Sequence, residues 1–193
     1  GSILDRIKKT TLWTPHVQRS PAIKSKITES IREVLYANNN YRRKFLNEIG
    51  EKIYKEWNPE KVEEWIRLTF LGSAREVGRS CLLLQTPNSK VLLDCGINVA
   101  GHGKDKFPYF DIPEFNIKDI DAVILSHAHL DHVGLLPYLY KMGYKGPTYM
   151  TPPTMDLAAL LSLDFIGVAY KQAATPLFSS KDIKEMVKHT ICL

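Results

Sequence analysis

A cluster of potential metal ligands directly follows a short apolar run, and it constrains the fold more than any other feature. Residues 122–125, Ala-Val-Ile-Leu, are typical of a buried strand, and residues 127–132 read His-Ala-His-Leu-Asp-His. The chain has six histidines in all, and this motif holds three of them beside an aspartate. Imidazole nitrogens and carboxylate oxygens are ligands that zinc prefers. The motif therefore predicts a metal site at the end of a strand.

The spacing of the four side chains favours two metal ions over one. Side chains alternate along extended chain, so His127 and His129 should project to the same side and meet one zinc ion. Asp131 and His132, at the start of a helix, should address a neighbouring position. Two zinc ions about 3.5–4 Å apart activate water for the hydrolysis of phosphodiesters, amides or thioesters.

The motif and two earlier segments resemble the β-CASP ribonucleases of the metallo-β-lactamase superfamily. The segments are 71–81, Leu-Gly-Ser-Ala-Arg-Glu-Val-Gly-Arg-Ser-Cys, and 91–98, Val-Leu-Leu-Asp-Cys-Gly-Ile-Asn. The likeness is strongest to the archaeal homologues of the cleavage and polyadenylation specificity factor subunit. It implies an α/β fold, with residues 65–193 as the first part of a metallo-β-lactamase αββα sandwich. Residues 1–64 would be a basic, mostly helical appendage, the tail of a small α+β KH-like RNA-binding domain.

The same resemblance assigns roles to the residues of the motif. His127, His129, Asp131 and His132 would bind zinc, and Asp94 and Asp131 would serve catalysis. Asp94 would orient a ligand histidine or the attacking water. The family takes its remaining ligands and its general acid from later motifs that have no match here. Two zinc ions are expected in the full-length protein, whereas this chain alone should bind metal weakly or be inactive.

The resemblance also implies a function and partners. We expect a zinc-dependent endoribonuclease, with 5′ to 3′ exonuclease action as a further activity, that acts in RNA 3′-end processing and transcription termination. RNA, the transcription machinery and a second copy of the full-length chain are the expected partners. Two alternatives stay open: another hydrolase of this fold acting on a thioester or small phosphodiester, and a non-catalytic RNA-binding scaffold.

Charge and composition agree with a cytoplasmic protein that binds polyanions. The net charge is +5, and all of it lies in residues 1–69, which hold fourteen Lys and Arg against nine Asp and Glu. Phosphate groups attract such a segment without regard to base sequence. No apolar run approaches the ~18 residues that span a membrane. The three cysteines predict neither a disulfide framework nor a thiolate metal site; they are Cys81, Cys95 and Cys192.

Apolar periodicity predicts the remaining elements. Two helices should fill the N-terminal segment, the first capped by Ser20-Pro21 and ended by residues 38–40, the second ended by Asn58-Pro59. The later elements are a hairpin of 81–86 with 90–94, a helix over 133–142, a strand over 147–150, a buried helix from 151, a helix from 180 and a strand from 190. A Gly-x-x-Gly sequence at 143–146 is read as a helix cap, not as a KH loop, and His102 and His189 receive no role.

Overall fold

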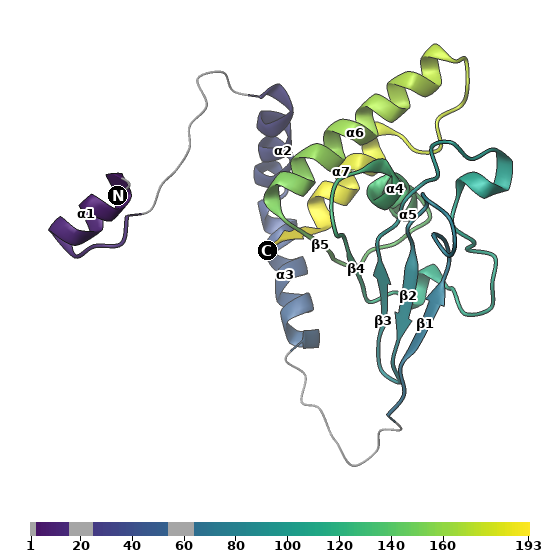
Figure 1. Cartoon of the computed structure of the whole chain (residues 1–193), viewed down its shortest axis with the longest axis horizontal. Coiled ribbons are helices and arrows are strands. Elements are labelled where there is room, and N and C mark those ends of the chain that lie inside the picture. The colour runs from purple at the N-terminus through teal and green to yellow at the C-terminus, as the bar shows by residue number, and fades with distance from the viewer. Residues whose placement is uncertain (1–2, 16–24, 54–63) are drawn as a thin grey trace.

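The computed structural model describes residues 3–15, 25–53 and 64–193 (Figure 1). Its α-helices are α1 (Ile3–Thr11), α2 (Lys26–Ala37), α3 (Asn39–Ile53), α4 (Leu130–Val133), α5 (Leu136–Lys141), α6 (Pro152–Lys171) and α7 (Ser180–His189). The strands are β1 (Arg67–Phe70), β2 (Leu82–Gln85), β3 (Lys90–Leu93), β4 (Ala122–Ile124), β5 (Thr148–Met150) and β6 (Thr190–Cys192), and two 3₁₀ helices are η2 (Gly103–Lys106) and η3 (Ile117–Asp119).

The six strands form one mixed sheet in the order of the sequence. β1, β2 and β3 pair antiparallel, and β3 to β6 pair parallel. The predicted hairpin is confirmed, with Leu82 opposite Leu93. Parallel neighbours need a crossover, and helices α4 to α7 supply it between β4, β5 and β6. The loop from residue 94 to residue 121 supplies the crossover between β3 and β4.

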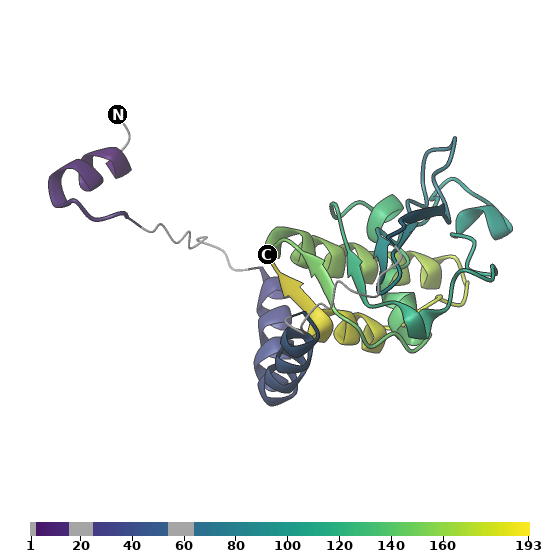
Figure 2. The same cartoon turned by 90° about the horizontal axis from the view of Figure 1, so that it is seen from below.

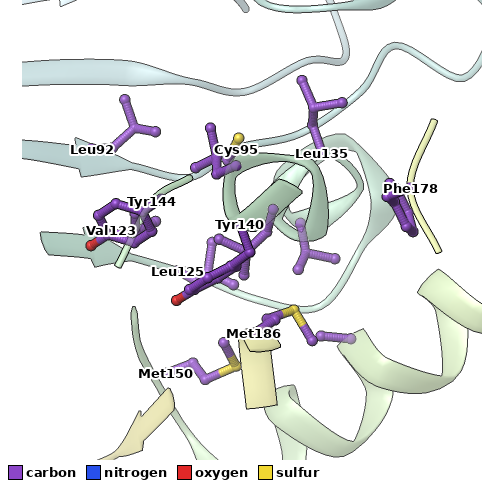
Figure 3. Close-up of a cluster of buried hydrophobic side chains, with 14 of the residues drawn as sticks. Leu92, Cys95, Val123, Leu125, Leu135, Tyr140, Tyr144, Met150, Phe178 and Met186 are labelled. Carbon is purple, nitrogen blue, oxygen red and sulfur yellow. The ribbon is translucent and has the colours of Figure 1, made fainter. Parts of the chain in front are cut away.

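One face of the sheet carries the core. Leu83, Leu92 and Val123 share this face at paired positions and are completely buried. Side chains from α5, α6 and α7 cover them, as the close-up of part of this cluster shows (Figure 3). Burying such side chains contributes about 1.5–3 kcal/mol each. This cluster is what fixes the helices against the strands.

The opposite face of the sheet is apolar but open in the described residues. A row of paired positions across five strands carries Phe70, Leu82, Leu93, Ile124 and Tyr149. Phe70 and Ile124 are exposed, and the other three are half-buried. The described residues thus form one sheet covered by one layer of helices. This corresponds to one half, αβ, of the αββα sandwich that the sequence predicts.

The N-terminal helices α2 and α3 pack against the helices that cover the sheet, near β6 (Figure 2). Arg42 of α3 donates to the carbonyl oxygens of Lys188 and Thr190 at 2.5 and 3.1 Å, where α7 ends and β6 begins. Tyr41 and His189 form a 2.8 Å hydrogen bond. The KH-like character of this segment stays a prediction.

Several predicted boundaries shift. The expected helix over 133–142 is two helices, because the chain turns at Gly134 and Leu135 between α4 and α5. We expected a buried helix from residue 151, but α6 is buried on one face only. Leu157 and Leu160 on its outer face are exposed. The predicted helix ends at Ser20-Pro21 and Asn58-Pro59 lie outside the described residues. Gly143 has a φ of +98° after α5, which confirms its role as a helix cap.

Helix α6 is also the one described helix whose length and composition would allow it to cross a membrane. Its inner face packs on α2, α4, α7 and β6. A core helix of a folded domain passes the same test of length and hydropathy. The packing therefore accounts for the apolar residues on the inner face of the helix, whereas several on the outer face are exposed in the described residues.

Replacing Arg42 should weaken the packing of α3 against the end of α7. The Arg42→Ala variant leaves the carbonyl groups at the end of α7 without their cationic donor, which should lower the free energy of unfolding by about 1–3 kcal/mol. Urea unfolding measures this. The matched control is Arg43→Ala, because Arg43 is exposed and its side chain makes no hydrogen bond or ion pair with another described residue. Equal losses in the two variants would contradict the docking role of Arg42.

His189 should make the fold sensitive to acid. Burial lowers the pKa of its imidazole, although the nearby Glu185 backbone and side chain oppose this. The unfolded chain then binds more protons than the folded one below the usual histidine pKa of about 6.5, so stability is lost as pH falls through that range. The unfolding free energy of the wild type should drop more steeply below pH 6.5 than that of His189→Gln. Parallel pH profiles would refute this.

Candidate metal centre

The centre lies where the carboxyl ends of two parallel strands meet. Leu93 of β3 pairs with Ile124 of β4, so the residues that follow each strand leave the sheet at the same edge. Asp94 has a φ of +59° and its N–H donates to the Ile124 carbonyl at 2.9 Å. Aspartate tolerates this left-handed conformation better than most residues. The turn points the Asp94 carboxylate toward the loop after β4.

Hydrogen-bond donors surround the Asp94 carboxylate, which is only 7% exposed. The backbone N–H of Ser126 donates to Oδ1 at 2.8 Å, and its hydroxyl lies 2.9 Å from the same oxygen. Ser80 donates to Oδ2 at 3.1 Å. His132 Nδ1 lies 2.7 Å from Oδ2. Hydrogen bonds from this many donors hold the carboxylate in one orientation.

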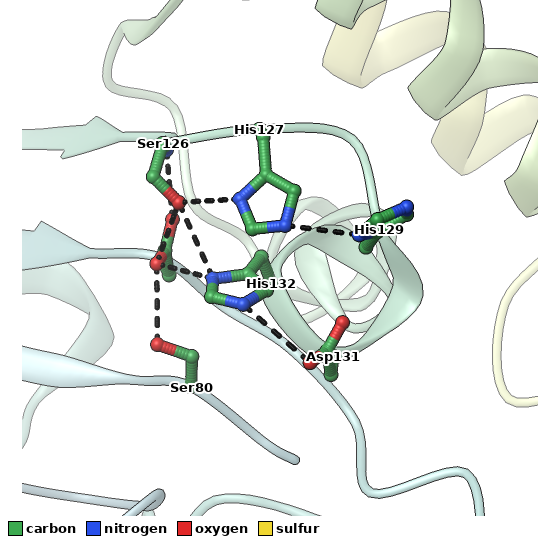
Figure 4. Close-up of polar contacts among 7 residues, drawn as sticks. Ser80, Ser126, His127, His129, Asp131 and His132 are labelled. Carbon is green, nitrogen blue, oxygen red and sulfur yellow. Dashed lines mark hydrogen bonds and ion pairs between the residues drawn. The ribbon is translucent and has the colours of Figure 1, made fainter. Parts of the chain in front are cut away.

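His127, Asp131 and His132 gather around one point, and His129 lies to one side of it (Figure 4). One ligand atom each from His127, Asp131 and His132 lies within 4.8 Å of the other two. His129 stands beside this group, with its Nδ1 3.1 Å from Nε2 of His127. His127 is thus close to both His129 and the Asp131–His132 pair. The division of the four ligands into two pairs, one per zinc ion, stays a prediction.

Hydrogen bonds to one ring nitrogen leave the other available for a metal. Nδ1 of His132 faces a carboxylate oxygen and must therefore carry a proton, which leaves Nε2 as the acceptor near Asp131 at 3.5 Å. Nδ1 of His127 lies 3.1 Å from the Ser126 hydroxyl, whose proton is directed at Asp94. His127 Nδ1 then donates to Ser126, which leaves its Nε2 as an acceptor, 3.1 Å from Nδ1 of His129. Metal-binding histidines are commonly oriented in this way.

This donor set fits zinc. Bonds of about 2.0–2.2 Å to imidazole nitrogen and carboxylate oxygen place ligand atoms at most about 4 Å apart. The spread within 4.8 Å among His127, Asp131 and His132 is close to this. Small side-chain rotations bring them to bonding distance. The nitrogen and oxygen chemistry, without a thiolate, is that of a catalytic site more than of a structural one.

Backbone hydrogen bonds clamp the loop that carries the ligands. The N–H groups of Ser80, Cys95 and Ile97 donate to the carbonyl groups of residues 131, 132 and 130, at 2.7, 2.7 and 2.9 Å. Gly96 makes this approach possible, because a Cβ atom there would lie 1.7 Å from the Asp131 carbonyl oxygen. The ligands are thereby fixed to the ends of β2 and β3 as well as to β4.

The structure brings all five predicted site residues together and adds two that sequence reasoning missed. Ser80 and Ser126 support Asp94, and Ser80 lies inside segment 71–81, which was singled out for another reason. Ser126 immediately precedes the motif, which was a usable signal. Nothing in the sequence linked Ser80 to Asp94. His102 is exposed in the loop after β3, and His189 is a core residue, so neither joins the centre.

Comparison with known families supports the fold. Residues 74–146 match the model of the metallo-beta-lactamase superfamily. This segment includes Asp94 and the whole histidine motif. A solved structure of a metallo-β-lactamase from Cronobacter sakazakii aligns with 44% of this chain and 32% of its own at 25% identity, with a TM-score of 0.36. That score is too low to support a conclusion.

Two relatives cover nearly the whole chain. The transcription termination factor FttA of Methanothermobacter thermautotrophicus is 51% identical over 100% of this chain, and that of Methanocaldococcus jannaschii is 49% identical over 99%. The chain spans 30% of the length of each of these proteins. Residues 74–146 of this chain are thus similar to the metallo-beta-lactamase superfamily, and the chain as a whole is similar to a part of archaeal proteins named transcription termination factor FttA.

Proposed function

We propose that the full-length protein is a zinc-dependent ribonuclease that hydrolyses RNA phosphodiester bonds in RNA 3′-end processing and transcription termination. The observation that carries this proposal is the gathering of His127, His129, Asp131 and His132 beside the well-supported Asp94 carboxylate. The superfamily commonly binds metal ions and hydrolyses its substrates, and the relatives are named for transcription termination.

The side chains of the centre have two different roles, metal binding and the positioning of a ligand. His127, His129, Asp131 and His132 would hold two zinc ions. Zinc in such a pair lowers the pKa of water and stabilises negative charge on phosphate oxygens. Asp94 keeps the proton of His132 on Nδ1, and so keeps Nε2 as the ligand atom. It acts as a positioning residue for His132.

RNA is the proposed substrate and partner because of the charge distribution. The N-terminal segment carries the whole net charge of +5, and Arg43 and Lys44 on α3 are exposed. Cations of this kind bind phosphates without base specificity. We further propose contact with the transcription machinery in the cytoplasm, and a homodimer of the full-length chain. Endonuclease action with additional 5′ to 3′ exonuclease action is the proposed mode.

Zinc-dependent RNA cleavage by the full-length protein tests the proposal. The wild type should cleave a 5′-labelled single-stranded RNA, lose activity when a chelator removes zinc, and regain it when zinc is added. The His127→Ala/His129→Ala variant should lose at least about 1,000-fold in rate, because it loses half of the ligands in the motif. His102→Ala, which changes an exposed histidine outside the centre, should retain activity.

The alternatives predict other results. Hydrolysis of a thioester without cleavage of RNA would assign the protein to another class of hydrolase. A folded protein that binds RNA but does not cleave it, with or without zinc, would be a scaffold. Either result would overturn the ribonuclease proposal.

The support that Asp94 gives to His132 should appear in metal affinity. Asp94→Asn keeps the size of the side chain but removes its charge, which frees the orientation and tautomer of His132. The zinc affinity of the full-length protein should fall about 10- to 100-fold, as competition with a fluorescent chelator would show. Asp111→Asn is the matched control, since Asp111 is exposed and distant in sequence from the motif. An unchanged affinity in Asp94→Asn would contradict the positioning role.

A further inference from the structure

A pocket of ≈ 540 Å³ opens directly beside the metal centre. Its wall contains His129 and Asp131 together with residues that no metal requires. These further residues are Val77, Asn98, Val99, Ala100, Leu130 and Leu161. Its size falls within the range of small-molecule sites, about 300–1,000 Å³. Lysine and arginine are absent from the part of its lining that the structure describes, so the pocket is not built for a phosphate group.

Two valines stand out from the protein at the rim of this pocket. Val77 is 89% exposed and Val99 is 63% exposed. Val77 lies in the connection between β1 and β2, and Val99 lies in the loop after β3. Neither side chain belongs to the buried core. Exposed valines cost hydration free energy unless something covers them. Their position beside the metal ligands indicates a ligand that extends from the centre.

A buried arginine makes this rim rigid. Arg79 is 5% exposed and donates to both carboxylate oxygens of Glu76, at 2.6 and 3.1 Å. It also donates to the Phe107 carbonyl at 3.0 Å and to the Tyr109 hydroxyl at 3.1 Å, and stacks 4.4 Å from the centre of the Tyr109 ring. The turn that bears Val77 is thereby tied to the loop after β3. A rigid apolar surface loses little entropy when a ligand binds.

Gly78 and Asn98 complete the rim. Gly78 has a φ of +109°, and a Cβ atom there would lie 3.0 Å from three atoms of Asn98. The absence of that atom lets Asn98 sit against the turn. Asn98 Oδ1 accepts from the Ala100 N–H at 3.1 Å, which fixes the side-chain amide. Within the described residues its Nδ2 group has no hydrogen-bond partner, so it can donate to a ligand.

We propose that the ligand is a nucleobase, namely one base of the RNA next to the scissile phosphate. Val77, Val99 and Leu161 contact the faces of this base. Asn98 Nδ2 donates a hydrogen bond to its edge. A base has apolar faces and polar acceptors on its edge, which match this wall. Proteins that hold an unstacked base use apolar contacts with hydrogen bonds to its edge. The inference rests on the proposed ribonuclease function and adds how substrate is positioned.

Abasic RNA tests this in the full-length, zinc-loaded protein. An RNA series would carry one abasic nucleotide, moved stepwise across the cleavage position, and KM and kcat would be measured for each. In the wild type, one abasic position should raise KM about 5- to 30-fold, because one base loses its apolar contacts. The Val77→Ser/Val99→Ser variant should raise KM for intact RNA by a similar factor and should not respond to the abasic nucleotide. Val168→Ser, an exposed valine outside the pocket, should behave as wild type.

Other outcomes overturn the proposal in distinguishable ways. If the same abasic position raises KM equally in the wild type and in the double variant, the base binds elsewhere. If no abasic position matters, no base is bound next to the scissile phosphate. A lower Tm of the RNA-free double variant with unchanged KM would show that another part of the protein covers the valines. A zinc-loaded wild type that does not cleave intact RNA would overturn the ribonuclease function and the base site together.

Discussion

The pairing of β3 with β4 is the constraint on which the rest of the site depends. It places Asp94 and the histidine motif at one edge of the sheet, although 32 residues separate Asp94 from Ser126. The Asp94 carboxylate then fixes both Ser126 and His132. Without this carboxylate, His132 would lose the partner that fixes its tautomer and the orientation of its ring. The buried side of the sheet supplies the stability that this arrangement requires.

Rigid supports surround the centre on two sides. Backbone hydrogen bonds from Ser80, Cys95 and Ile97 hold the ligand loop, and Arg79 holds the turn beside it. Both supports involve segment 71–81, which precedes the first strand of the hairpin. A metal centre that must place a reacting phosphate accurately needs such preorganisation. The apolar rim next to His129 then provides room for the part of a substrate that carries no charge.

The sequence alone predicted the local features well. The hairpin and the strand before the motif follow from apolar patterning, which acts over a few residues. The four residues of the motif were proposed from ligand chemistry and Asp94 from the family resemblance, and their roles as ligands and supports stay predictions. Contacts between distant segments were not predictable in this way. Arg42 binds the end of α7 across 146 residues, and His189 is a core residue that no pattern marked. The break between α4 and α5 was missed because Gly134 and Leu135 also fit a continuous helix.

We expect the four residues of the motif, His127, His129, Asp131 and His132, to bind two zinc ions. Anomalous diffraction at the zinc absorption edge from crystals of the full-length protein tests it most directly. We expect two anomalous peaks about 3.5–4 Å apart, one bonded to His127 and His129 and the other to Asp131 and His132. A well-ordered structure, grown with zinc present, that shows no anomalous peak at these residues would contradict the account.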